Sequence, residues 1–75
     1  MSSTRDEKIL IAFGKHFQKI RKSKKISLRK LEAMADVDHS EIHRIEKGLR
    51  NPSLTTILAL AKALKVNPSE LLDNL

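Results

Sequence analysis

The sequence predicts an all-α fold, and three observations support this prediction. No stretch alternates apolar and polar residues with a period of two, whereas several segments repeat apolar residues at every third or fourth position. Only two glycines and two prolines interrupt the chain. Residues typical of helix starts and stops divide it into five short helices. We expect one domain, residues 1–75, because a chain of this length can bury only one small core.

The first two helices are predicted from their caps and apolar spacing. The first begins at Thr4, because Thr4 and Glu7 have the spacing of a capping box. Its apolar stripe consists of Ile9, Phe13, Phe17 and Ile20. The second begins after Ser27, a good N-cap residue, and continues to Ala35. Its inward-facing residues are Leu28, Leu31 and Ala35.

The last three helices follow by the same reasoning. Asp38 and Glu41 form a second capping box, and the third helix ends at Gly48 with Ile42 and Ile45 facing inward. Ser53 caps the fourth helix. Its apolar face consists of Leu54, Ile57, Leu58, Ala61 and Leu64. Asn67 caps a fifth helix of about two turns, residues 67–75.

Charge and composition limit the possible partners. The chain carries 15 Lys and Arg against 9 Asp and Glu, giving +6 and a pI near 10.0, so an anionic partner such as nucleic acid is expected. Nine basic residues and no acidic residue lie between Lys8 and Leu31, although a solvated helix face would explain this charge equally well. Phe13 and Phe17 are the only aromatics, which disfavours proteins that stack single-stranded bases.

Several classes of function are excluded. Cysteine is absent, so disulfide frameworks and Cys-ligated zinc sites are impossible. No targeting segment or apolar run approaches the length of a membrane span, so we expect a cytoplasmic protein with no membrane partner. There is no Gly-rich phosphate loop and no constellation of catalytic side chains, so an enzyme is not expected.

The most informative segment is residues 27–48, which read SLRKLEAMADVDHSEIHRIEKG. Two short helices are separated only by Asp36, Val37 and Asp38, which is too short for an antiparallel loop and fits a sharp turn. The second helix directs apolar residues inward and polar residues outward. This layout is typical of a helix-turn-helix, whose second helix enters the major groove of DNA.

At this point the sequence resembles the Cro/repressor-like (XRE) family of helix-turn-helix regulators. The resemblance covers Phe17 to Leu72 and is carried by IRKSKKISLRKLEAMADV, IHRIEKGLRNPSLTTILALAKAL and the I-x-x-I-E-x-G-x-x-x-P-S-L pattern. It implies a five-helix, lambda-repressor-like DNA-binding domain. Two positions depart from the family pattern. Asp36 replaces the usual turn glycine, and Leu28 replaces a glutamine that contacts phosphate, which leaves that contact to backbone N–H groups.

Site residues follow from the motif and the resemblance. Arg44 is expected to read guanine, unless it is only a solvated charge or pairs with Glu41. The base-reading candidates are His39, Ser40, His43 and Arg44. The phosphate candidates are Lys24, Lys25, Arg29, Lys47, Arg50 and Asn51. The resemblance also implies a partly buried salt bridge between Arg21 and Glu46, and a dimer interface that contains Leu71, Leu72 and Leu75.

No metal or other cofactor is expected. His39 and His43 have a spacing that suits a metal, but two imidazoles without a nearby third ligand make a weak site. His16 is expected to be a packing or surface residue of the first helix.

The sequence therefore predicts a transcriptional regulator that binds a palindromic operator in double-stranded DNA as a homodimer. A restriction-modification controller, a small phage-type repressor and a stand-alone regulator all fit this prediction. The alternative is an antitoxin-type interaction module that masks a toxin and also binds DNA. Candidate protein partners are accordingly RNA polymerase or a toxin-like protein.

Overall fold

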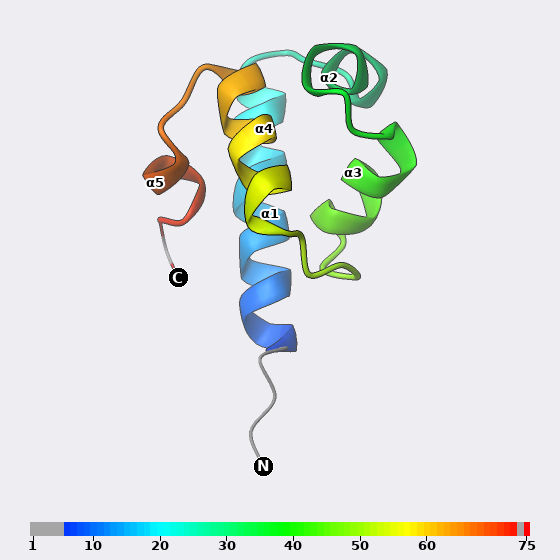
Figure 1. Ribbon diagram of the computed structural model, residues 1–75. Coiled ribbons are helices and arrows are strands. Elements are labelled where there is room, and N and C mark those ends of the chain that lie inside the picture. Colours follow the sequence, from blue (N-terminus) through cyan, green and yellow to red (C-terminus); the bar gives the residue numbers. More distant parts are fainter. Residues whose placement is uncertain (1–5, 74) are drawn as a thin grey trace.

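The computed structural model describes residues 6–73 and 75, and all regular structure in this part of the chain is helical. The five helices are α1 (Glu7–Ser23), α2 (Leu28–Ala35), α3 (His39–Glu46), α4 (Leu54–Leu64) and α5 (Pro68–Leu71). Their packing contacts run from α1 to α3, then to α2, α4 and α5, and back to α1. In Figure 1, α4 crosses in front of α1, while α2 and α3 lie on one side and α5 on the other. The predicted all-α, five-helix fold is confirmed.

The core lies inside this circuit of helices. It consists of Phe13, Phe17, Leu31, Ile42, Ile45, Leu60, Ala61, Leu64 and Leu71. The rings of Phe13 and Phe17 are stacked, with centroids 6.1 Å apart, and fill the space beside α1. Ile42 and Ile45 are both fully buried, so α3 is fixed to the core by two side chains spaced three residues apart.

Three of the predicted N-caps are present as hydrogen bonds. The Ser27 hydroxyl accepts from the Lys30 N–H, the Asp38 carboxylate accepts from the Ser40 N–H, and the Ser53 hydroxyl accepts from the Thr56 N–H. These caps define the starts of α2, α3 and α4. The segment that carries the helix-turn-helix therefore begins and turns where the sequence predicts.

The predicted start of the first helix is wrong. The helix begins at Glu7, and Asp6 is its N-cap, because the Asp6 carboxylate accepts from the N–H groups of Lys8 and Ile9 at 3.0 and 3.2 Å. Thr4, the predicted cap, lies outside the described residues. An acidic N-cap satisfies two free N–H groups and also places its charge at the positive end of the helix dipole.

The predicted fifth helix is too long. The structure has a single turn, Pro68–Leu71, and the Asn67 side chain makes no cap hydrogen bond. The turn closes with a bond from the Leu72 N–H to the Ser69 carbonyl, at 3.2 Å. Because Leu71 alone anchors this turn in the core, little holds the following residues in a helix.

Spacing predicted most members of the apolar faces of α1 and α4 correctly but misplaced three residues. On α1, Leu10 is buried and Ile9 is 48% exposed. On α4, Leu60 is fully buried, whereas Leu54 and Leu58 are exposed. Both helices carry apolar residues on more than one side, so periodicity alone does not decide which side faces the core.

A buried ion pair joins α1 to the end of α3. The Nε of Arg21 donates to Oε2 of Glu46 at 2.5 Å, and its Nη2 donates to Oε1 at 2.9 Å. Gln18 adds a bond to Oε1 at 3.1 Å, and Nη1 of Arg21 donates to the Ile26 carbonyl at 2.8 Å. The side chains of Arg21 and Glu46 are 8% and 0% exposed. The pair therefore fixes the last turn of α3 against α1 and the turn that precedes α2.

Gly14 allows the close approach that this ion pair requires. A Cβ at this position would lie 2.5 Å from the Ile45 carbonyl oxygen and 2.6 Å from that of Glu46. Both atoms belong to the backbone of α3, so no side-chain movement can relieve the contact. The glycine in the middle of α1 is thus explained by packing, despite its low helix propensity.

Replacing Gly14 with alanine is expected to push α1 and α3 apart. Gly14→Ala should lower the free energy of unfolding by about 1–3 kcal/mol, even after the gain in helix propensity. Urea unfolding measures the loss. The matched control is Lys15→Ala at the exposed neighbouring position, which should change stability by less than about 0.5 kcal/mol. Equal unfolding midpoints for the two variants would contradict this account of the α1–α3 contact.

A double-mutant cycle tests the Arg21–Glu46 pair. Glu46→Leu or Arg21→Met alone should cost about 3–5 kcal/mol, because each leaves a buried charge without its partner. Glu46→Leu combined with Arg21→Met should recover most of this loss, since it replaces the pair with apolar groups. Urea unfolding again supplies the free energies. If a single variant does not fold, recovery of a cooperative transition in the double variant still demonstrates the coupling. Additive effects of the two changes would show that the pair is not coupled.

Candidate nucleic-acid interface

The turn between α2 and α3 is sharp because Asp36 adopts a left-handed conformation, with φ 57° and ψ 42°. Its N–H donates to the Glu32 carbonyl at 2.9 Å and closes the end of α2. A side chain in this conformation costs about 1 kcal/mol relative to glycine. Val37 then packs against the core, and Asp38 starts α3. The connection therefore has the geometry of a helix-turn-helix.

Asp38 organises the N-terminus of α3. One carboxylate oxygen accepts from the Ser40 N–H at 3.0 Å and from the Ser40 hydroxyl at 3.1 Å. These bonds lower the pKa of Asp38, the backbone bond most strongly, and the positive charge of Arg44 acts in the same direction. Because the pKa is lower in the folded state, the ionised cap stabilises the fold fully above the unfolded-state pKa. This stabilisation is lost as the pH falls through the folded-state pKa.

The outer face of α3 presents side chains that are free to bind. His43 and Arg44 are exposed and form no side-chain hydrogen bond or ion pair with another described residue. The alternative partner of Arg44, Glu41, instead accepts from Nε of Arg50 at 3.1 Å. Arg44 therefore projects a complete guanidinium fork from the middle of the helix, where it can form two parallel hydrogen bonds.

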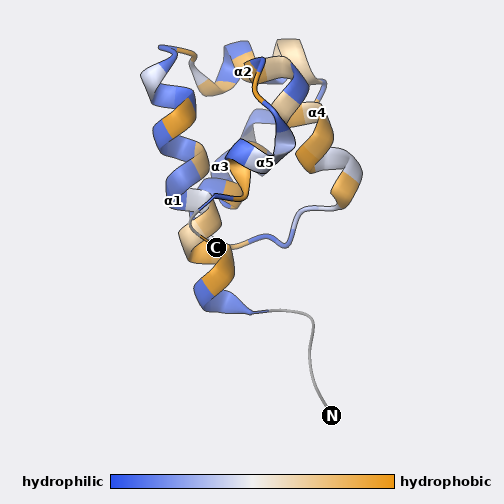
Figure 2. Ribbon diagram, turned by 90° about the vertical axis from the view of Figure 1, so that its left-hand side faces the viewer, coloured by the Kyte–Doolittle hydropathy of each residue, from blue (hydrophilic) through white to orange (hydrophobic). Residues whose placement is uncertain are grey.

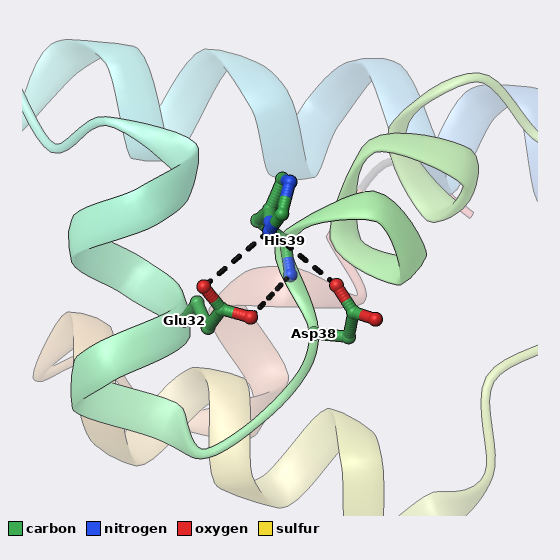
Figure 3. A group of neighbouring side chains, drawn as sticks. All are labelled: Glu32, Asp38 and His39. Atoms are coloured by element: carbon green, nitrogen blue, oxygen red, sulfur yellow. Dashed lines mark hydrogen bonds and ion pairs between the residues drawn. The ribbon is translucent and has the colours of Figure 1, made fainter.

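His39 and Ser40 are more constrained. The Ser40 hydroxyl is engaged by Asp38, and the His39 side chain is 34% exposed, lying between Glu32 and Asp38 (Figure 3). These three residues bring potential ligand atoms within 4.8 Å of one another. This cluster differs from the His39–His43 pair considered from the sequence, because it does not include His43. The carboxylates of Glu32 and Asp38 already accept hydrogen bonds from backbone N–H groups at the start of α3, which explains their positions. We therefore assign no metal ion to this cluster.

The phosphate candidates lie at two ends of the motif. Lys24 and Lys25 form the turn before α2, and Arg29 lies in its first turn. Lys47, Arg50 and Asn51 follow α3. All six residues are exposed. Arg50 has a competing partner in Glu41, but both side chains are more than one-third exposed, and exposed pairs of this kind contribute only about 0–1 kcal/mol.

Sequence reasoning missed three side-chain contacts that connect helices. Gln18 supports the Arg21–Glu46 pair, and its position three residues before Arg21 on the same helix side was an available signal. Glu32 accepts from the His39 N–H, and no pattern in the sequence indicates this contact. His16, expected only to pack or lie on the surface, approaches the Glu70 carbonyl with its Nε2 at 2.7 Å and connects α1 to α5.

The C-terminal leucines have different environments. Leu71 is fully buried in its own chain, so it belongs to the core and offers no surface to a second copy. Leu72 and Leu75 are 46% and 54% exposed. They border an apolar groove whose other apolar lining residues are Ile9, Leu10, Phe13, Pro52 and Ile57. In Figure 2 the C-terminus lies beside the first turns of α1, where hydrophobic residues gather.

Comparisons with known proteins agree with this geometry. A helix-turn-helix family model matches residues 17–71. The control protein C.BamHI from Bacillus amyloliquefaciens is 42% identical over 66 residues, which cover 87% of this chain and 82% of that protein. The HTH-type transcriptional regulator y4dJ from Sinorhizobium fredii is 33% identical over 58 residues, covering 77% of this chain and 75% of the regulator.

A solved structure extends the likeness to three dimensions. The crystal structure of the restriction-modification controller protein C.AhdI from Aeromonas hydrophila is similar with a TM-score of 0.81 and 39% identity, over 83% of this chain and 94% of that one. None of the described helices has the length and apolar character needed to cross a membrane. By fold, motif and sequence identity, the chain belongs to the XRE-type helix-turn-helix family, whose members are DNA-binding transcriptional regulators and not enzymes.

Proposed function

We propose that this protein is a regulator of the restriction-modification controller kind, which binds a palindromic operator as a homodimer with α3 in the major groove. The observation that carries the proposal is the division of α3 into two faces. Ile42 and Ile45 are buried, whereas His43 and Arg44 are exposed and have no partner in the described chain. The similarity to C.BamHI and C.AhdI favours this function over an antitoxin-type module.

In this proposal the outer face of α3 reads bases. Arg44 donates two hydrogen bonds to O6 and N7 of a guanine, the commonest specific contact in the major groove. His43 lies beside it, and His39 and Ser40 occupy the first turn, where recognition helices begin their base contacts. Ser40 contributes mainly by supporting the Asp38 N-cap, because its hydroxyl already donates to the Asp38 carboxylate.

The surrounding basic residues position the protein on the DNA backbone. Lys24, Lys25 and Arg29 lie at the N-terminal end of α2, and Lys47, Arg50 and Asn51 follow α3, so the two groups can contact phosphates on either side of the groove. Leu28 offers no polar side chain to the backbone. The first N–H groups of α2 therefore supply a phosphate contact at that point.

The homodimer is proposed to form around the apolar groove beside the C-terminus. Leu72 and Leu75 border the groove, and Ile9 on α1 and Ile57 on α4 line it. A patch of this kind on a small protein typically marks an interface. Two-fold symmetry would place two copies of α3 on successive turns of the major groove and match a palindromic site.

Base reading and backbone positioning are separable by mutation. Arg44→Ala should weaken operator binding by about 1–3 kcal/mol per contact and relax the preference at one base pair in each half-site. Lys47→Ala should instead weaken binding to operator and random DNA about equally, because phosphates are the same at every base step. It should also reduce the slope of log affinity against log salt by about two in the dimer.

Selection of bound sites from random duplex DNA, followed by salt titration, makes both measurements. Lys47 is a better control than Arg50, because Arg50→Ala also releases Glu41. If Arg44→Ala weakened binding to operator and random DNA equally and left the base preference unchanged, Arg44 would contact only phosphate.

The dimer proposal is tested by placing charge in the groove. Leu72→Glu with Leu75→Glu should give a folded monomer with weak operator binding, because carboxylates cannot be buried against Ile9 and Ile57 without a partner. Met34→Glu is the matched control, since Met34 is an exposed apolar residue on α2, away from the groove. Analytical ultracentrifugation measures the assembly. A monomeric unmodified protein at tens of micromolar would contradict the proposal.

A further inference from the structure

Glu32 on α2 reaches across the turn to the first residue of α3. Its Oε2 accepts from the His39 backbone N–H at 3.3 Å, and its Oε1 lies 3.3 Å from Nδ1 of the His39 ring (Figure 3). Glu32 is only partly exposed and makes no other side-chain bond in the described chain. One carboxylate therefore contacts both the backbone and the side chain of a residue at the start of the recognition helix.

The His39 ring is held by one edge. Nδ1 is shielded from solvent and lies 3.3 Å from Glu32 and 3.4 Å from Asp38, but neither contact has the alignment of a hydrogen bond. The other edge of the ring points away from both carboxylates, and Nε2 makes no hydrogen bond to a described residue. The side chain as a whole is 34% exposed, so its accessible area belongs to ring atoms other than the shielded Nδ1.

The charges around the ring determine which nitrogen carries the proton. Glu32 from α2 and Asp38 from the start of α3 both face Nδ1. His43 and the positively charged Arg44 lie further along α3. A carboxylate can face an N–H but repels the lone pair of an unprotonated nitrogen. The neutral ring therefore carries its hydrogen on Nδ1 and exposes the lone pair of Nε2.

We propose that Glu32 is a specificity-determining positioning residue, which holds His39 so that Nε2 faces the DNA as a hydrogen-bond acceptor. This inference rests on the proposed function. In the major groove an acceptor on the protein pairs with an exocyclic amino group, either N4 of cytosine or N6 of adenine. His39 thus prefers a base pair that presents an amino group, and Glu32 sets this preference without touching DNA.

The test combines one variant with two measurements. Glu32→Gln keeps the size of the side chain and an oxygen for the His39 N–H, but it removes the charge and can donate an amide hydrogen to Nδ1. Long-range proton–nitrogen NMR correlations report the tautomer of His39 in the free protein, at a pH where the same spectra show a neutral ring. We expect the Nδ1–H form in the unmodified protein and a larger share of the Nε2–H form in Glu32→Gln.

The second measurement is the base preference of the same proteins, obtained by selecting sites from random duplex DNA. Glu32→Gln should reduce the preference for an amino-bearing base at one position per half-site by about fivefold or more. In a His39→Ala background it should have no further effect. Glu7→Gln, the same chemical change at an exposed position on α1, should alter neither tautomer nor preference.

A purely structural role for Glu32 would appear as lost stability without these changes. The inference is overturned if both proteins show the same tautomer, or if Glu32→Gln leaves the base preference intact on a normal operator. The absence of any preferred site for the unmodified protein would instead overturn the proposed function. The two failures are therefore distinguishable.

Discussion

The buried ion pair between Arg21 and Glu46 is the interaction on which the rest of the structure depends. Both charges lie in a core too small to tolerate an unpaired one, and their hydrogen bonds connect α1, the turn before α2 and the last turn of α3. Gly14 lets the backbones of α1 and α3 approach closely enough for this bidentate geometry. These hydrogen bonds therefore hold the C-terminal end of α3 against α1, and they help to set the direction in which its outer face points.

The opposite end of α3 is held by carboxylates that arrive from two directions. Asp38 caps the helix from within the turn, and Glu32 contacts its first residue from α2. Two isoleucines fix the inner face between these ends. With both termini and one face engaged, the remaining side chains of α3 have a defined geometry, and in the proposed complex they would be presented to DNA. Such a pre-organised surface loses little conformational entropy on binding, which leaves more of the contact energy for base discrimination.

The sequence predicted the helical fold, the sharp turn and the caps of α2, α3 and α4, because local hydrogen bonds and apolar spacing determine these features. The sequence-based prediction failed where contacts between helices determine which side chains are buried and where a helix ends. The spacing predicted that Ile9 and Leu54 are buried, but both are exposed in the structure. Leu10 and Leu60 are buried instead. An Asn67 cap predicted a two-turn final helix, but the structure has a single turn in which Leu71 is the buried residue. Glu32 could not be assigned to His39 from sequence, since their contact depends on how α2 and α3 cross.

The groove beside the C-terminus connects stability to regulation in the proposed dimer. A single core in a domain below about 70–80 residues rarely supplies more than about 3–5 kcal/mol, and this chain has no disulfide to add to it. Burying Leu72 and Leu75 against a second copy would remove exposed apolar surface and stabilise each protomer as the protein concentration rises. Folding, dimerisation and operator occupancy would then all depend on the same concentration. A small regulator built in this way needs no separate ligand-binding domain for its activity to follow its own accumulation.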